Sequence, residues 1–135
     1  MAWTPLACSE IVLRAILKKG WLDQYERINA HAFIRRPSEP DGLSVNIHSK
    51  TPELTLWLSS FKTSFGADSL HTGRVRNIGL GLDVGQTEAD RQAQPDHAVI
   101  TGVPLQDEDA LLAERIASEL TRICRAVDRV RRARQ

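Results

Sequence analysis

The segment from Ala30 to Ile47 constrains the fold more than any other part of the chain. Residues 30–34 form an apolar run with β-forming side chains, and residues 43–47 alternate apolar and polar side chains as a half-buried strand does. Between them, residues 35–42 contain two prolines, an aspartate and a glycine, which favour a turn. Two β-like runs around such a loop predict a β-hairpin with a long connection.

The N-terminal segment allows two interpretations. Thr4 and Pro5 suit the cap and first turn of a helix, and residues 18–20, Lys-Lys-Gly, suit its end. The apolar run from Ile11 to Ile16 is also compatible with a strand, because so short a run has no decisive periodicity. The capping signals favour the helix.

A second helix is predicted after the hairpin. Thr51-Pro52-Glu53 is typical of a helix start. The apolar residues that follow, spaced along one helical face, are Leu54, Trp57, Leu58 and Phe61. Further along, the sequence predicts a short helix at 72–77 ended by Gly79, a strand at 80–84, an exposed loop at 86–95 and a strand at 97–103.

The longest predicted helix begins at a cap on Asp107 and runs to about Arg132. Its apolar residues recur at spacings of four and three: Leu112, Ile116, Leu120, Ile123, Val127 and Val130. Acidic residues at its start and arginines at its end match the helix dipole. Such a seam suits a core helix and a short coiled coil alike.

These elements predict one α+β domain over residues 1–135. The economical arrangement is a two-layer fold, in which a sheet carries helices packed on one face together with the long C-terminal helix. An arginine-rich helical end is expected at about 129–135. The composition, with 41% hydrophobic and 26% charged residues, is close to that of globular domains.

Charge and cysteine content narrow the setting. The formal net charge of +1 favours no class of partner. Cys8 and Cys124 are too few to indicate a disulfide framework, so a reduced, cytoplasmic setting is expected. No leader-like N-terminus and no apolar run of membrane-spanning length is present in the sequence, so we expect no membrane partner.

His97 and Ser44 are the candidate catalytic residues. His97 opens an apolar strand after Pro95-Asp96 and is suited to act as a general base. Asp96, its neighbour, would point the other way on a strand, so it is not expected to orient the imidazole. Ser44, in Gly-Leu-Ser-Val-Asn, has half of a nucleophile-elbow pattern. The competing interpretations are a strand-capping histidine and an ordinary sheet serine.

Two groups of arginines are candidate anion sites. The first, for a phosphate or carboxylate substrate, is Arg14, Arg27, Arg35 and Arg36. The second, for nucleic-acid phosphates, is Arg122, Arg125, Arg129, Arg131 and Arg132. In both groups the alternative is a solvated surface. Histidine and cysteine spacings indicate no metal site, and no cofactor is expected.

A short set of motifs resembles a group of small, uncharacterised bacterial proteins. The motifs are Ala32-Phe33, then Gly42-Leu43-Ser44-Val45, then His97-Ala98-Val99-Ile100 with Gly102. The resemblance covers the chain from Arg14 to about Leu120. The group has no assigned activity, so the resemblance implies a bacterial, cytoplasmic setting and no more.

Three functions follow from these observations. The first is a binding protein with a protein partner, which includes a second copy of the chain held through the C-terminal helix. The second is a small enzyme on a phosphorylated or nucleotide-like substrate, with His97 and the hairpin arginines as its site. The third is nucleic-acid binding through the arginine-rich helix. Convergence of His97, Ser44 and an arginine in one pocket would favour the second.

Overall fold

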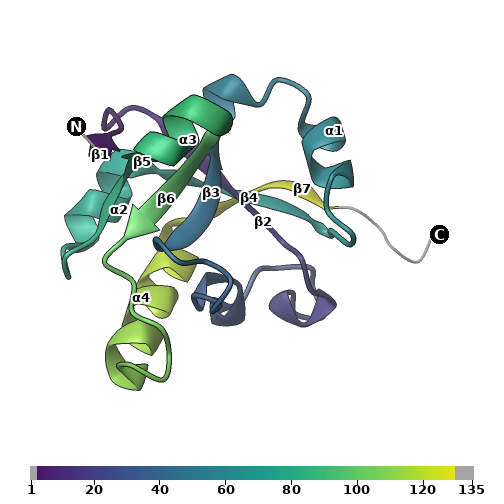
Figure 1. Cartoon of the computed structure of the whole chain (residues 1–135). Coiled ribbons are helices and arrows are strands. Elements are labelled where there is room, and N and C mark those ends of the chain that lie inside the picture. Colours follow the sequence, from purple (N-terminus) through teal and green to yellow (C-terminus); the bar gives the residue numbers. More distant parts are fainter. Residues whose placement is uncertain (1–2, 130–135) are drawn as a thin grey trace.

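A single antiparallel sheet is the frame of the molecule. In the computed structural model, which describes residues 3–129, seven strands pair in the order β1-β5-β6-β3-β2-β4-β7 (Figure 1). The strands are β1 (Trp3–Pro5), β2 (Ile11–Ala15), β3 (Leu43–Ile47), β4 (Gly66–His71), β5 (Asp83–Thr87), β6 (His97–Thr101) and β7 (Arg125–Arg129). All six neighbouring pairs are antiparallel.

Helices complete the predicted α+β fold. The α-helices are α1 (Leu54–Ser59), α2 (Thr72–Ile78), α3 (Glu88–Ala93) and α4 (Ala110–Ile123). Three 3-10 turns, η1 (Lys19–Trp21), η2 (Ala30–Phe33) and η3 (His48–Lys50), lie in the connections. The fold class is therefore confirmed, with α4 as the long C-terminal helix. No helix within residues 3–129 is long and apolar enough to cross a membrane.

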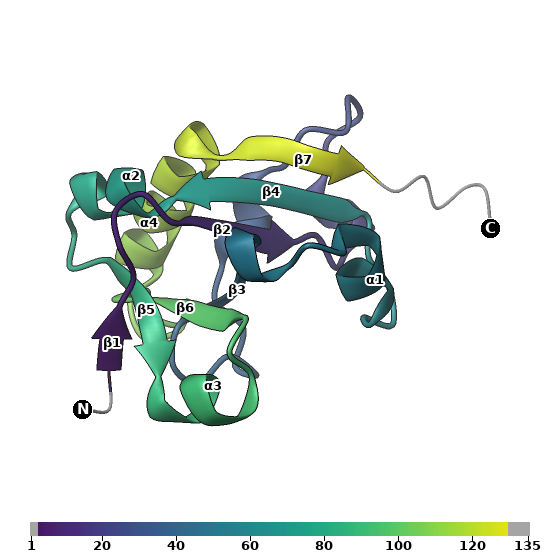
Figure 2. The same cartoon turned by 90° about the horizontal axis from the view of Figure 1, so that it is seen from above.

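The main core lies between the sheet and a layer made of α4, α2 and η2. Ile116 and Leu120 of α4, both fully buried, pack with strand residues such as Val45 and Ile100, and with Phe33 of η2. Seen from above, α2 and α4 lie together at one end of the sheet, while α1 lies at the other (Figure 2). The predicted seam of α4 thus packs into the core, with Ile116 and Leu120 fully buried and Leu112 and Ile123 partly buried.

A smaller apolar cluster fixes α1. Leu58 is buried against Ala15 of β2 and Ala67 of β4, and the other predicted face residues of this helix pack around it. The apolar face predicted for this helix is therefore confirmed. Its start differs, because the Thr51 hydroxyl donates to the Ile47 carbonyl at 2.7 Å and does not cap the helix.

The predicted N-terminal helix is wrong, because residues 11–15 form the strand β2. Val12 and Leu13 are both fully buried, although they point to opposite faces of the sheet. A strand buried on both faces has a continuous apolar sequence, which resembles a short helix. The residues interpreted as helix-capping signals lie elsewhere: Pro5 ends β1, and Gly20 is in η1.

The predicted hairpin is also wrong. Residues 30–33 form η2, which begins where the Asn29 side chain accepts a hydrogen bond from the His31 amide at 3.0 Å. The strand at 43–47 does form, but it pairs with β2 and β6. Gly42 precedes it with φ +142°, and a Cβ there would collide with the Ile100 carbonyl oxygen. The Gly-Leu-Ser-Val motif thus reflects a close approach of two strands.

Two further predictions need correction in the second half of the chain. Residues 88–93 form α3, where an exposed loop is predicted. The C-terminal helix is capped by Asp109, not Asp107, and ends at Ile123, after which the chain becomes the edge strand β7. Val127 is consequently 41% exposed, and Val130 lies outside the described residues. The short helix ended by Gly79 and the strand from His97 are confirmed, and the strand predicted at 80–84 lies slightly later, at 83–87.

Candidate functional site

The sheet opens between β2 and β3. These strands pair only at Val12–Ile47 and Leu13–Asn46. Beyond that point β2 continues along β4 as far as Ala15, and β3 continues along β6 as far as Leu43. The backbone of Ser44 therefore faces a gap where a neighbouring strand would normally supply hydrogen bonds.

Arg14 and Glu39 fill this gap. Arg14 Nη1 donates to Glu39 Oε2 at 2.6 Å and to the Ser44 carbonyl at 2.9 Å, and its Nε donates to the Ala32 carbonyl. The Ser44 amide donates to Glu39 Oε2 at 2.8 Å. Both side chains are only 2% exposed. A buried ion pair thus replaces the missing strand hydrogen bonds, and Arg14 is structural in addition to lining the cavity described below.

Electrostatics keep Glu39 ionised in this buried place. Burial alone would raise the pKa of Glu39, but attraction to Arg14 and hydrogen bonds from Arg14, Arg36 and Ser44 outweigh it. Together they lower the pKa from 4.5 to about 2. Burial lowers the pKa of the Arg14 guanidinium, against the attraction of Glu39. The Trp21 ring lies 5.4 Å from the Arg14 guanidinium carbon.

The other three arginines predicted to bind a phosphate or carboxylate have different roles. Arg35 donates to three backbone carbonyls, those of Glu39, Pro40 and Val103, so it is occupied in holding the loop. Arg27 is exposed and pairs with Asp23 at 2.9 Å, away from the sheet opening. Arg36 uses Nε on Glu39, and its side chain is 33% exposed. Of the four, Arg36 is the best placed to contact an anion.

A cavity of about 180 Å³ lies beside the sheet opening, and we call it the split-sheet cavity. The residues that line it are Arg14, Ala15, Leu17, Arg36, Ser44, Val45, Asn46, Trp57, Phe61 and His97. One wall is aromatic, with the Trp57 and Phe61 ring centroids 5.6 Å apart. The strand wall is polar. Both candidate catalytic residues and two of the four candidate substrate arginines therefore meet here.

His97 is held in this cavity by Asp90. Its Nδ1 lies 2.7 Å from Asp90 Oδ1. Asp90 is itself fixed, because its Oδ2 accepts the Thr87 amide at 2.9 Å in the capping box of α3. An ionised carboxylate only accepts hydrogen bonds, so Nδ1 carries the proton and Nε2 is the nitrogen left for a ligand.

Ser44 lines the same cavity without contacting His97. In the register of β3 and β6, Ser44 lies opposite Val99, and His97 lies opposite Asn46. Ser44 and His97 are therefore diagonal neighbours, and no hydrogen bond joins their side chains in the described part of the chain. The Asn46 side chain donates to Asp96 Oδ2 at 3.1 Å. Asp96 thus accepts a hydrogen bond from Asn46, while Asp90 orients His97.

Arg36 also lines a larger hollow of about 480 Å³. This hollow lies beside η2 and α4, and Lys18, Trp21, His31 and Gln106 are among its lining residues. Lys18 and Arg36 thus provide two cations to the larger hollow, and Glu114 provides one carboxylate.

The arginines near the C-terminus do not form one helical surface. Arg129 lies in β7, where its Nη2 is 2.6 Å from Asp68 Oδ1, so the predicted helical end is wrong at this residue. Arg122 is on α4 and Arg125 opens β7, and both are exposed. Arg131 and Arg132 lie outside the described residues.

Sequence reasoning missed Asp90, Trp57 and Phe61 as site residues. The signal for Asp90 was present: Thr87-x-x-Asp90 has the spacing of a capping box, at the start of the segment interpreted as a loop. Trp57 and Phe61 were assigned to the core, and they also line the cavity.

Comparisons with known proteins identify no relative. No family model matches the chain, and no curated protein or solved structure is significantly similar to it. The resemblance to small bacterial proteins therefore stays a prediction. Within residues 3–129, no group of three or more histidine, cysteine, aspartate or glutamate side chains is placed to hold a metal ion.

Proposed function

We propose that this protein is a small enzyme that binds a phosphorylated or nucleotide-like ligand at the split-sheet cavity and transfers a proton through His97. The observation that carries the proposal is the convergence of an oriented histidine and a partly exposed arginine in one cavity. Pockets that combine an apolar wall with a few convergent polar groups are the usual place for ligand chemistry.

The parts of the cavity suit different parts of such a ligand. The wall of Trp57 and Phe61 accepts a planar or apolar group. Arg36 offers its terminal nitrogens to an anionic group, and Lys18 adds a second cation in the larger hollow that Arg36 also lines. The volume of about 180 Å³ is below that of a typical ligand pocket, and the proposal assigns the rest of the ligand to the larger hollow that Arg36 also lines.

His97 supplies the chemistry in this proposal. Asp90 fixes the orientation of the imidazole through Nδ1, which leaves Nε2 to take a proton from the ligand and return it at a later step. Asp90 acts as a positioning residue, because it contacts His97 and not the cavity. Ser44 contributes a hydroxyl to the wall, with no general base beside it.

The protein-binding hypothesis loses its main sequence argument. The α4 seam offered to a second copy is occupied by the core, where Ile116 and Leu120 are fully buried. Leu111, on the outer side of the helix, is 83% exposed but isolated. A protein partner stays a prediction. The exposed surface of α4 supports it less than the split-sheet cavity supports a small ligand.

A thermal-shift panel tests ligand binding. Inorganic phosphate, AMP and NAD are added at millimolar concentration, and at tenfold excess over Kd a bound ligand stabilises the fold by about 1.4 kcal/mol. Lys18→Ala should reduce the shift, whereas Lys19→Ala, the neighbouring exposed lysine outside both hollows, should not. Absence of any shift, or equal shifts in the two variants, would contradict the proposal.

Turnover of a stabilising ligand then tests the chemistry. Products are followed by phosphorus NMR in wild type, in His97→Gln and in the matched His48→Gln, which changes an exposed histidine of η3. His97→Gln should keep the thermal shift and lose turnover, because binding and proton transfer use different residues. Equal turnover in the two variants would remove His97 from the mechanism.

A further inference from the structure

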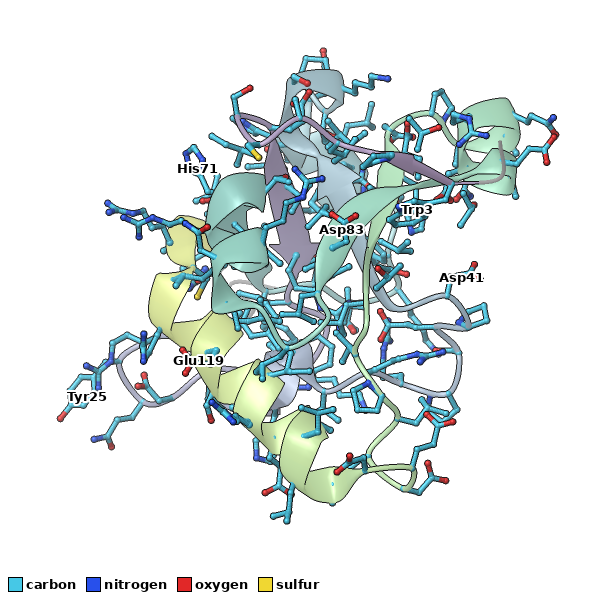
Figure 3. All side chains as sticks on the ribbon, turned by 90° about the vertical axis from the view of Figure 1, so that its left-hand side faces the viewer. Trp3, Tyr25, Asp41, His71, Asp83 and Glu119 are labelled. Atoms are coloured by element: carbon cyan, nitrogen blue, oxygen red, sulfur yellow. The ribbon has the colours of Figure 1, made fainter. Side chains whose placement is uncertain are left out.

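A second polar surface lies on the opposite side of the molecule from α1. Two hollows, of about 410 Å³ and 320 Å³, lie side by side as a paired depression, because Arg74 and Ile123 line both. It runs between α2, the end of α4 and the start of β7. Figure 3 shows this side, with His71 beside α2 and Glu119 on α4.

Arginines dominate this depression. The four that line it are Arg74, Arg115, Arg122 and Arg125, and we call the patch the arginine surface. Glu119 is its one acidic lining residue, which leaves a net charge of +3 (four positive, one negative) on a chain whose total is +1. The fold therefore concentrates positive charge that the sequence spreads over residues 74–125.

These arginines are available to a ligand. Arg122 pairs with Glu119 at 3.2 Å, but its side chain is 73% exposed, and such a pair is worth about 0–1 kcal/mol. Arg74, Arg115 and Arg125 are exposed, and within residues 3–129 they form no ion pair.

We infer that the arginine surface binds the phosphodiester backbone of a double-stranded nucleic acid. Four arginines contributed by α2, α4 and β7 over two adjoining hollows suit several phosphates better than a single compact anion. Ser69, His71 and Asn77 add hydrogen-bonding side chains to the same lining. The lining contains no tryptophan, tyrosine or phenylalanine, and the small ring of His71 is its one aromatic group, which favours a duplex over a single strand whose bases need stacking platforms. Arg74 and Arg115, which no sequence pattern singled out, are central to it.

The inference is independent of the split-sheet cavity. The two sites share no lining residue, so either can fail without the other. The test is fluorescence anisotropy with a labelled mixed-sequence duplex of DNA, repeated with the same duplex as RNA, and with poly-glutamate as an acidic polypeptide. For three to four phosphate contacts, duplex affinity should fall about 40- to 150-fold between about 50 and 200 mM salt.

Matched variants test whether the arginine surface is responsible for duplex binding. The double substitution Arg74→Glu with Arg115→Glu should weaken duplex binding more than tenfold and reduce the salt slope by about 2. The control, Lys50→Glu with Lys62→Glu, makes the same charge change on exposed residues near α1 and should leave binding within about twofold. Melting curves check that both variants fold.

Each outcome bears on the inference. Duplex binding that the Arg74/Arg115 variant loses and the control keeps supports it, and the DNA and RNA arms then say which duplex is preferred. No duplex binding at low salt overturns it. Equal losses in the two double variants overturn it as well, since net charge alone would then explain the effect. Tighter binding to poly-glutamate than to either duplex would replace nucleic acid with an acidic protein as the partner.

Discussion

At the scale of single residues, the Arg14–Glu39 pair explains why the sheet tolerates an opening. A backbone amide and carbonyl left without partners in the interior cost free energy comparable to lost hydrogen bonds. Here Glu39 accepts the Ser44 amide and Arg14 donates to the Ser44 carbonyl. The loop that carries Glu39 is thereby fixed against β3, and Arg36 with it.

Glu39→Gln should destabilise the protein in a pH-dependent way. A carboxyl whose pKa falls on folding stabilises the folded state above its ordinary pKa, and this contribution is lost as pH falls through the window from 4.5 to about 2. The lowering is worth about 3 kcal/mol of unfolding free energy. Urea denaturation should therefore show wild type more stable than Glu39→Gln at neutral pH, with the difference shrinking toward pH 2.

The exposed Asp41, in the same loop, provides the control. Asp41→Asn should change the unfolding free energy by less than about 0.5 kcal/mol at every pH. If the difference in unfolding free energy between wild type and Glu39→Gln stayed constant down to acid pH, the charge of Glu39 would not be the source of its stabilising effect.

Arg129 has a structural role that its sequence context does not reveal. Its partner Asp68 is buried, so Arg129→Ala leaves a carboxylate without its cation and should cost about 3 kcal/mol in a urea melt. Arg122→Ala removes an exposed pair and should cost less than about 1 kcal/mol. Equal, small losses would show that the C-terminal arginines are interchangeable, as their sequence suggests.

At the scale of elements, the sequence identifies those that carry a one-sided apolar pattern. The face of α1, the helix ended by Gly79, β6 and the first part of α4 are all predictable from such patterns. The elements that the sequence predicts wrongly lack such a pattern, each for a different reason. β2 is buried on both faces, η2 is too short to have a period, and β7 continues the α4 spacing with Val127 by coincidence.

The candidate site was predictable in its parts but not in its assembly. His97 and Ser44 stand out as polar residues on apolar strands, and Arg36 as a loop cation. The contact between His97 and Asp90 depends on α3, which a polar segment hides. The opening between β2 and β3 depends on strand order, which local spacing does not determine.

α3 is expected to depend on its capping box. Thr87 Oγ accepts the Asp90 amide at 3.1 Å, and Thr87→Ala should cost about 1 kcal/mol because the first turn loses this acceptor. Thr55→Ala, on the exposed side of α1, should cost nothing, since alanine favours helix more than threonine does. Chemical denaturation of the two variants compares them directly, and equal stabilities would mean that the cap contributes nothing.

At the scale of the whole molecule, one sheet serves two separate surfaces. The split-sheet cavity lies beside the opening between β2 and β3 and is lined by Trp57 of α1, whereas residues of α2, α4 and β7 line the arginine surface. In the cartoon, α1 lies at one end of the sheet and α2 and α4 lie at the other (Figure 2). The first surface has the features of a small-ligand site, and the second those of a polyanion site. An enzyme acting on a nucleotide-like ligand and a duplex-binding surface are compatible on one small domain.

The most direct test of the proposed function is a long-range proton–nitrogen NMR spectrum of the four histidines. At alkaline pH, where imidazoles are neutral, His97 should carry its proton on Nδ1, because Asp90 accepts it there. Adding AMP should shift the Nε2 signal of His97 while the signal of exposed His48 stays in place. A proton on Nε2 of His97, or the same response to AMP from both histidines, would contradict the account.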